Sequence, residues 1–524
     1  MKILVLQLAR LGDIFQTWPA LHALRRQGAE IHVLVRPRFR SAAERCDAIQ
    51  KIYDFETDTI LSPVLEDPRR GLQPSLEAID NLMQKLDHEK YDRVVNLSFS
   101  PLSSWLTFDL EMRAFQRGKT IACAGYTRHI DGALAIPDDA SAYFFAQVGY
   151  RVQSGSTEPV NRLSISRLFA TIAGVDPIEA DWRGPSELLP LGGDIRLPVD
   201  FVCVHIGASD EAKTLDACAW GEVVARIVRR TEMPVVLLGA AEEMTKAAEI
   251  ISEVELNGVS LNHEGRLTNR VLSLVGKTKV SELFEIVREA KLLIAGDSAL
   301  VQVASLVGTR VLNLSSRTVS HWETGPATRG SRILLYGGAA PAAETIVREA
   351  ENMIFEVARE RNGSNEISNF VSQADRVVAG PIEPITEHTK DGYADFMWQL
   401  ISAIYLGTKV PRNNDEHLQA VLVQWSEVQN IENHQLNSLR ENKGDPRQIA
   451  EILNRIDQVT GLIVESEPRL GPIERWWSTE RVRLGPQTQE SLTDKYLVLN
   501  AQLESVLLSL REFEERHDGQ QLDL

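Results

Sequence analysis

The chain has 524 residues, of which 43% are hydrophobic and 25% are charged. This composition is ordinary for a globular protein and excludes collagen-like, disulfide-scaffold and wholly disordered proteins. The net charge of −17 is uneven, because the residues from Pro341 onward carry −13 and the first 340 carry only −4. The acidic C-terminal part argues against a nucleic-acid partner there.

The N-terminus starts with a short apolar run that imitates a signal peptide, but Arg10 and Asp13 interrupt it too early. No segment reaches the roughly 18–20 apolar residues that a membrane span needs. Four well-separated cysteines without a C-x-x-C pair fit a reducing compartment. We expect a soluble protein of a bacterial-type cytoplasm, with at most peripheral contact to the inner membrane.

In the first part of the chain, short apolar runs alternate with amphipathic segments. Such runs indicate strands buried on both faces of a parallel α/β sheet. The predicted strands cover 2–8, 30–36, 93–97 and 120–124, and the predicted helices cover 14–26 and 101–115. A connector rich in Pro and Gly follows at 181–199.

The same alternation restarts in the second part. Strands are expected at 201–206, 234–238, 292–294 and 310–314, and helices at 220–230, 280–290 and 300–306. Two doubly wound halves in succession predict two Rossmann-like domains that face a cleft. In such sheets, ligands bind outside the carboxyl ends of the strands.

From about residue 361 the strands disappear, and helical periodicity covers 416–442, 446–467 and 491–516. We expect an antiparallel helical bundle there. The predicted domains are therefore 1–185, 186–360 and 361–524. Trp398, Trp425, Trp476 and Trp477 suit either the core of this bundle or a surface for a partner.

The first candidate motif follows the first predicted strand, where Gly12 and Asp13 begin a helix. A glycine at this turn lets backbone approach a ligand, and the carboxylate lies where catalytic groups belong. Asp13 equally suits the cap of that helix. The chain contains neither G-x-G-x-x-G nor a P-loop, which disfavours dinucleotide and Walker-type phosphate sites.

Three later strand ends carry similar groups. Gly207, Ala208 and Ser209, with Lys213 and Trp220 downstream, suit an anion or a small-residue turn with a solvated lysine. In this segment His205 is interpreted as a core or strand-end histidine rather than a ligand. Glu242 and Glu243 suit ribose hydroxyls or the start of the next helix.

The last strand end carries Asp297 and Ser298 at the start of a helix. This helix N-terminus suits a diphosphate, although either side chain could simply cap the helix. Further along, Thr324-Gly325-Pro326 is interpreted as a turn.

In this order, L-G-D, H-x-G-A-S…K…W, L-L-G-x-x-x-E, G-K-T…E-L, D-S-x, G-T and T-G-P resemble glycosyltransferase family 9. Its best-known members are the ADP-heptose:lipopolysaccharide heptosyltransferases, and the similarity covers roughly Met1–Glu356. The resemblance implies the GT-B architecture, with the acceptor on the first domain and the nucleotide sugar on the second. It also implies inverting transfer without a metal, and the sequence shows neither a convincing D-x-D pair nor zinc-ligand spacing among its histidines.

The resemblance also implies roles for individual residues. Asp13 matches the general base, Lys213 the lysine at the donor phosphates, and Glu243 the carboxylate near the ribose, with Glu242 as the alternative. The remaining expected donor contacts are Gly12, Ser209, Asp297, Ser298, Ala299 and Gln302. The chain departs from the family pattern D-[ST]-G-x-x-H at Ala299 and Gln302, and its spacing from Lys213 to Trp220 exceeds the common K-x-W.

The expected acceptor is a surface glycan, a glycolipid or a protein. Arg10, Arg36 and Arg38, together with Arg40, could meet an anionic acceptor such as a phosphorylated lipid A–core oligosaccharide, or could be solvated. Residues 361–524 are expected to mediate self-association or to bind a protein partner or the acceptor. The alternatives are an eroded, non-catalytic GT-B scaffold that binds a nucleotide or partner, which Ala299 and Gln302 favour, and a nucleotide-sugar epimerase, which the motifs match poorly.

Overall fold

The structure is a computed structural model of residues 1–524. It describes all of them except 151–159, 194, 209, 211–212, 260–261, 264–265, 268–269, 317–318, 337–340, 362–391, 412, 414, 442–445, 486–488 and 512–524. The chain divides into two compact units. Unit 1 comprises Met1–Ser98, Leu110–Ala122 and Leu163–Thr386; unit 2 comprises Phe99–Asp109, Cys123–Arg162 and Glu387–Leu524. The predicted boundaries at 185 and 360 stay predictions.

The first sheet has the strand order β3-β2-β1-β4-β5. Its strands are β1 (Lys2–Leu6), β2 (Glu30–Val35), β3 (Lys51–Asp54), β4 (Arg93–Asn96) and β5 (Ala122–Gly125). The pairs β3-β2, β2-β1 and β1-β4 are parallel, with Val5 opposite both Val33 and Val95. The helices along this part are α1 (Leu11–Arg26), α2 (Arg40–Ala43), α3 (Thr57–Glu66), α4 (Pro68–His88), α5 (Pro101–Gln116) and α7 (Ile165–Ile172).

The second sheet is parallel throughout, with the order β12-β9-β8-β13-β14-β15. Its strands are β8 (Val202–His205), β9 (Val235–Leu238), β12 (Val271–Ser273), β13 (Leu292–Ala295), β14 (Val311–Ser316) and β15 (Arg332–Tyr336). The accompanying helices are α8 (Ala217–Thr231), α9 (Met244–Leu256), α10 (Leu283–Glu289), α11 (Ala299–Val307), α12 (His321–Thr324) and α13 (Ala343–Arg361). The predicted α/β class with parallel sheets is confirmed.

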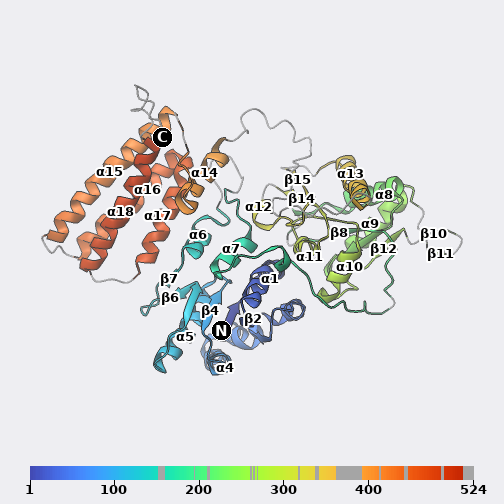
Figure 1. Ribbon diagram of the computed structural model, residues 1–524, viewed down its shortest axis with the longest axis horizontal. Coiled ribbons are helices and arrows are strands. Elements are labelled where there is room, and N and C mark those ends of the chain that lie inside the picture. The colour runs from blue at the N-terminus through green and yellow to red at the C-terminus, as the bar shows by residue number, and fades with distance from the viewer. Residues whose placement is uncertain are drawn as a thin grey trace. The chain divides into compact units, whose positions relative to one another are not determined.

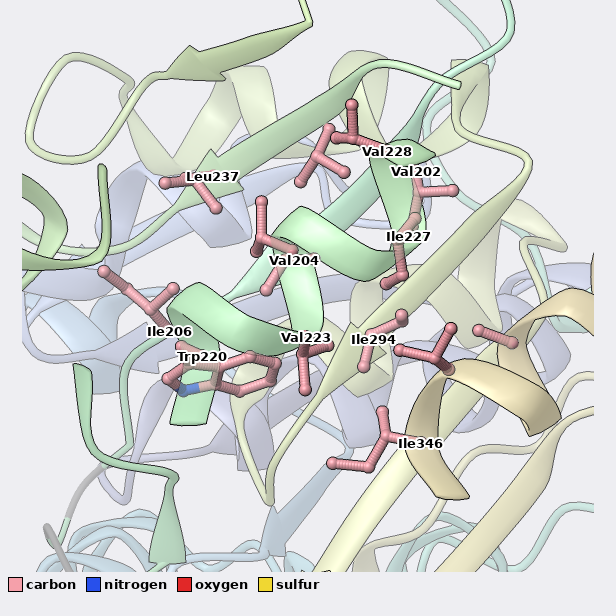
Figure 2. Packing of buried hydrophobic residues seen from close by; sticks show 14 of the residues in the cluster. Val202, Val204, Ile206, Trp220, Val223, Ile227, Val228, Leu237, Ile294 and Ile346 are labelled. Atoms are coloured by element: carbon pink, nitrogen blue, oxygen red, sulfur yellow. The ribbon is translucent and has the colours of Figure 1, made fainter. Parts of the chain in front are cut away.

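The strands of the second sheet are apolar because their side chains form a hydrophobic core with the covering helices. Val204 and Ile294, on neighbouring strands β8 and β13, are fully buried and pack with Trp220 and Val223 of α8. Figure 2 shows these side chains together, with Ile346 of α13 among them. Because both faces of the sheet are covered, its strands are largely apolar, and most of their polar groups lie near the strand ends.

Among the residues that the structure describes, the last part of the chain contributes these helices to unit 2: α14 (Gly392–Leu406), α15 (Glu416–Glu441), α16 (Pro446–Ser466), α17 (Gly471–Leu484) and α18 (Gln489–Arg511). Figure 1 shows α15, α16, α17 and α18 in orange to red, running alongside one another. The expected helical region is therefore confirmed. Trp425 and Trp477 are buried, whereas Trp398 and Trp476 are partly exposed.

The helices of unit 2 do not stand alone, because α17 packs against α6 (Asp139–Gln147). The Arg475 guanidinium donates to the carbonyl of Ala146, and the amide of Gln147 donates to the carbonyl of Pro472 at 3.3 Å. Segments from the first third of the chain thus complete the helical unit. In the described part of the chain, no helix is both long and apolar enough to cross a membrane.

Candidate active site

Asp13 lies in the first turn of α1, shortly after the carboxyl end of β1. Its Oδ2 accepts a hydrogen bond from the backbone N–H of Arg10 at 2.9 Å. Burial raises the pKa of Asp13 and the charge of Asp297 adds to this rise, while the N–H and the charge of Arg10 oppose it. One oxygen therefore caps the helix while the group as a whole becomes a stronger base, so the two sequence interpretations are compatible.

The start of α11 faces the start of α1. A Cβ atom on Gly12 would lie 3.9 Å from the Cα of Ala299, which is ordinary van der Waals contact. The two helices pack against each other from there. Gly12, Asp13, Asp297 and Ala299 are thus brought together, as the sequence predicts for two facing strand ends.

The turn between β13 and α11 is held from two sides. The side-chain amide of Asn313 donates to the carbonyls of Ala295 and Gly296 at 3.2 and 3.1 Å. A Cβ on Gly296 would lie 2.6 Å from the carbonyl oxygen of Lys213, so this position requires glycine. The loop that carries Lys213 therefore lies directly against the start of α11.

Ser298 precedes α11, and its hydroxyl oxygen is buried without a hydrogen-bond partner in the described part of the chain. A buried hydroxyl left unpaired costs free energy, about 1–3 kcal/mol. Free N–H groups at the start of the same helix add positive potential. Hydroxyl and helix N-terminus together suit the oxygens of a phosphate group.

Lys213 follows β8 on a loop that is tied to the core. The Trp220 indole N–H donates to the Thr214 hydroxyl at 3.2 Å, and that hydroxyl donates to the carbonyl of Ile206 at 3.0 Å. Trp220 is therefore a core residue that anchors the loop. The Lys213 ammonium has no ion pair with any described residue, which leaves its charge available to an anion.

Glu243 follows β9 and lies in a cradle of two glycines. A Cβ on Gly207 would come within 1.8 Å of Glu243 Oε1, and one on Gly239 within 2.6 Å of Oε2. The same Oε2 accepts from the backbone N–H of Ala240 at 2.5 Å. Glu242 is exposed, so the structure favours Glu243 as the positioned carboxylate of the pair.

His205 ends β8, and Ser209 of the same motif lies outside the described residues. Burial lowers the pKa of His205 to about 4, so its imidazole is neutral at pH 7. Its Nδ1 atom is buried without a hydrogen-bond partner in the described part of the chain. The lysine of α9, Lys246, donates to the carbonyl of Ile206 at 3.1 Å and adds a cation that the sequence analysis missed.

Gln302 lies on α11, one turn into the helix, and its side-chain amide donates to the carbonyl of Thr324. The Thr324 hydroxyl in turn donates to Asp297 Oδ1 at 2.8 Å. From α1, the Gln16 amide donates to the carbonyl of Glu323 at 3.2 Å. The sequence analysis missed Gln16, although it lies three residues after Asp13 on α1, and missed the role of Thr324, because the contacts of both join segments that are separate in the sequence.

The four arginines near the first two strand ends differ in their surroundings. Arg40 is paired with Glu44 and Asp54, whereas Arg38 lies over the ring of Phe39. Burial lowers the pKa of Arg36, and the charge of Arg38 adds to this effect. Arg10 is exposed. Neither Arg10, Arg36 nor Arg38 forms an ion pair with a described residue, so these three stay acceptor candidates and Arg40 does not.

Among the described residues, no cluster of three or more His, Cys, Asp or Glu side chains could hold a metal ion. The site is thus built from carboxylates, lysines, hydroxyls and helix N-termini at the carboxyl ends of β1, β8, β9 and β13. Such groups can take a proton from a hydroxyl and can balance the charge of a phosphate.

Residues 79–352 match the family model of glycosyltransferase family 9 (heptosyltransferase). Among solved structures, the *E. coli* ADP-heptose LPS heptosyltransferase II is 17% identical, with 68% of this chain and 100% of that chain covered and a TM-score of 0.44. *E. coli* heptosyltransferase WaaC with ADP is 11% identical, with 67% and 100% covered and a TM-score of 0.47.

A third solved structure is the iron-containing dodecameric glycosyltransferase TibC from enterotoxigenic *E. coli* H10407. It is 12% identical, with 62% of this chain and 61% of that chain covered and a TM-score of 0.30. No curated protein matches the sequence. The family match spans more than half of the chain. The chain therefore belongs to glycosyltransferase family 9 and is a glycosyltransferase.

Proposed function

We propose that this glycosyltransferase moves heptose from ADP-heptose to a hydroxyl group of a lipopolysaccharide core or a related surface-glycan or protein acceptor, with inversion. The observation that carries the proposal is the partly buried carboxylate of Asp13, which faces Asp297 and the start of α11. Its raised pKa suits proton abstraction from an alcohol, which is otherwise a poor nucleophile.

In the proposed step, the acceptor oxygen forms a bond to the anomeric carbon on the face opposite the diphosphate. The bond from that carbon to the β-phosphate oxygen breaks, and its electron pair leaves with ADP. The hydroxyl proton passes to Asp13. A single displacement of this kind inverts the anomeric configuration.

The charge that develops on the departing ADP needs a counterpart. Lys213 supplies an ammonium that forms no ion pair with a described residue, and Ser298 supplies a buried hydroxyl at the N-terminus of α11. Glu243 would accept hydrogen bonds from ribose hydroxyls. With these groups in place, the proposed reaction requires no metal ion or other cofactor.

The acceptor side of the proposal rests on charge. Arg10, Arg36 and Arg38 form no ion pair with a described acidic residue, and a phosphorylated acceptor would supply a partner. The four free cysteines fit a reducing compartment, so the proposed place of action is the bacterial cytoplasm, at the inner face of the inner membrane. Self-association or partner binding through 361–524 stays a prediction.

The test is calorimetric titration of the full chain with ADP, UDP and GDP, followed by ADP-heptose. We expect micromolar binding of the adenine compounds and weak binding of the other two. Equal binding of all three nucleotides would contradict the choice of donor. No binding of any nucleotide would contradict the donor site itself and favour a partner-binding relative.

A further inference from the structure

The C-terminal end of the short helix α12 is a point where two buried glutamines converge. A helix end leaves its last carbonyl groups without partners inside the helix. Here the backbone carbonyl of Glu323 accepts a hydrogen bond from the side-chain amide of Gln16 on α1. The backbone carbonyl of Thr324 accepts one from the side-chain amide of Gln302 on α11. Both glutamines are almost fully buried.

Further contacts fix the chain directly after α12. Gly325 requires the absence of a side chain, because a Cβ there would lie 2.3 Å from the carbonyl oxygen of His321. The backbone N–H of Ala327 donates to the Ser305 hydroxyl of α11 at 2.9 Å. The turn predicted at Thr324-Gly325-Pro326 is therefore a rigid connection along α11.

This connection carries one side chain into the candidate active site. The Thr324 hydroxyl has a single proton and two acceptors, Asp297 Oδ1 at 2.8 Å and the Ser320 carbonyl at 3.2 Å. The shorter, charge-assisted bond to Asp297 is the stronger of the two. Asp297 is held in this way near Asp13, whose other charged neighbour is Arg10.

We propose that Gln16 and Gln302 are positioning residues, a pair of amides that clamps residues 323–324 and thereby holds Asp297 beside Asp13. The inference rests on the proposed role of Asp13 as the base. It changes the interpretation of Gln302. The side-chain amide donates a hydrogen bond within the protein and does not serve as a contact to the sugar donor. Because α1 and α11 each contribute one amide, the clamp also ties the base to the donor side of the site.

The clamp predicts a specific change in pH dependence. When Asp297 is released, its charge no longer raises the pKa of Asp13. The acid limb of the kcat profile then moves to lower pH, because a base with a lower pKa stays deprotonated in more acidic solution. The plateau value of kcat falls as well, since a weaker base abstracts the proton less readily and the site is less well aligned.

The variants are Gln302→Met, Gln16→Met and Thr324→Val, which keep size and remove the hydrogen-bond donor. The matched control is Gln147→Met, a buried glutamine of unit 2 whose amide also donates to a backbone carbonyl. ADP release from ADP-heptose is measured across pH with a lipid A–core oligosaccharide as acceptor, and ADP affinity is measured by calorimetry.

We expect each clamp variant to lower kcat about tenfold and to shift the acid limb downward, with ADP affinity within about twofold of wild type. The control should retain the wild-type profile. Gln302→His, which restores a donor, should recover part of the loss. A tenfold weaker ADP affinity in Gln302→Met, but not in Gln16→Met or Thr324→Val, would overturn the inference and make Gln302 a donor contact. An unchanged acid limb of the kcat profile would also overturn the inference.

A measurement without substrates separates this inference from the proposed function. Because the folded-state pKa of Asp13 is raised, its ionisation destabilises the protein progressively as pH rises from about 4 through that pKa. Release of Asp297 lessens this loss, so Tm of Gln302→Met should fall less than Tm of Gln147→Met as pH rises from about 4. Equal falls would overturn the clamp even if the wild type transfers no sugar.

Discussion

The two units of the molecule place their polar groups differently. In the second half of unit 1, the interior cluster consists of aliphatic side chains, Met353 and Trp220, and most polar groups of the strands lie near the strand ends. In unit 2, polar side chains lie inside the helical bundle: the Gln429 amide donates to the Asn500 carbonyl, and the Asn500 amide donates to Asn433 at 2.7 Å. Buried polar pairs between α15 and α18 suit a role in fixing how these helices pair.

This difference indicates in which part of the molecule catalytic groups are expected. A largely apolar sheet interior leaves most reactive groups at the carboxyl edge, so the candidate site of unit 1 can be traced along the chain. A helix has no such edge, and polar residues inside a bundle serve packing as readily as binding. The following variants test whether the catalytic groups belong to unit 1 and whether the buried residues of unit 2 serve the stability of that unit.

The largest effect is expected from Asp13→Asn. An amide cannot accept the acceptor proton, so we expect turnover to fall by about 10²–10⁴-fold while ADP affinity stays near wild type. Steady-state kinetics and calorimetry measure the two quantities. The control is Asp216→Asn at the N-cap of α8, where the Asp216 carboxylate accepts a hydrogen bond from the backbone N–H of Ala219 at 2.8 Å. Asparagine caps equally well. Near-normal turnover in Asp13→Asn would remove Asp13 as the base.

In unit 2, Trp477→Ala should cause a loss of about 3–5 kcal/mol in the free energy of unfolding, because it empties a large buried site. Trp477 is 1% exposed and packs edge-on against Tyr496, with the Arg481 guanidinium over its ring. Denaturant unfolding measures the loss. Ile431→Ala on the exposed side of α15 is the control and should change stability by less than about 0.5 kcal/mol.

The same Trp477 variant should bind ADP as wild type does, since the proposed donor groups all lie in unit 1. A large loss of ADP affinity in the folded variant would contradict the separation of roles. Deletion of 387–524 is a poorer test, because it would also strip the partners of Ala146 and Gln147 on α6.

Much of unit 1 could be predicted from sequence because its strands are apolar on both faces. The runs around Val5, Val204 and Ile294 mark β1, β8 and β13 to within two residues at each end. The edge strand β3 escaped prediction because it reads Lys-Ile-Tyr-Asp and is only partly buried. In unit 2 the long helices were predictable from periodicity, but their pairing with α6 is a long-range contact that no local pattern reveals.

The candidate site was predictable to the same extent. Residues next to strand ends, such as Asp13 and Asp297, could be found from their place in the chain. Gln16 and Lys246 could not, because the contact of each is with a backbone carbonyl that is distant along the chain. Gln302 was found for a different reason, as a departure from the family pattern, and its contact with Thr324 became visible only in the structure.

A smaller effect is expected from Gly207→Ala. The added Cβ would collide with Glu243 Oε1, and because that oxygen ends a flexible side chain, the carboxylate should move aside at little cost in stability. Loss of its hydrogen bonds to ribose should weaken ADP binding about tenfold, on the order of 1.4 kcal/mol. Gly461→Ala in α16 meets no atom within 4 Å and should slightly stabilise unit 2. Unchanged ADP affinity in Gly207→Ala would separate Glu243 from the nucleotide.

The smallest effect concerns Glu432 of α15, which faces Arg481 of α17 and Tyr496 of α18. Burial raises the pKa of Glu432 to about 7, against the opposing charge of Arg481. The folded state therefore holds this proton more tightly than the unfolded chain, and the contribution of Glu432 to stability is lost as pH rises from about 4.5 through 7. Glu432→Gln stays neutral, so its Tm should fall by a few degrees less than that of wild type between pH 5 and 8. A parallel fall in both proteins would show that Glu432 is ionised in the bundle throughout, paired with Arg481.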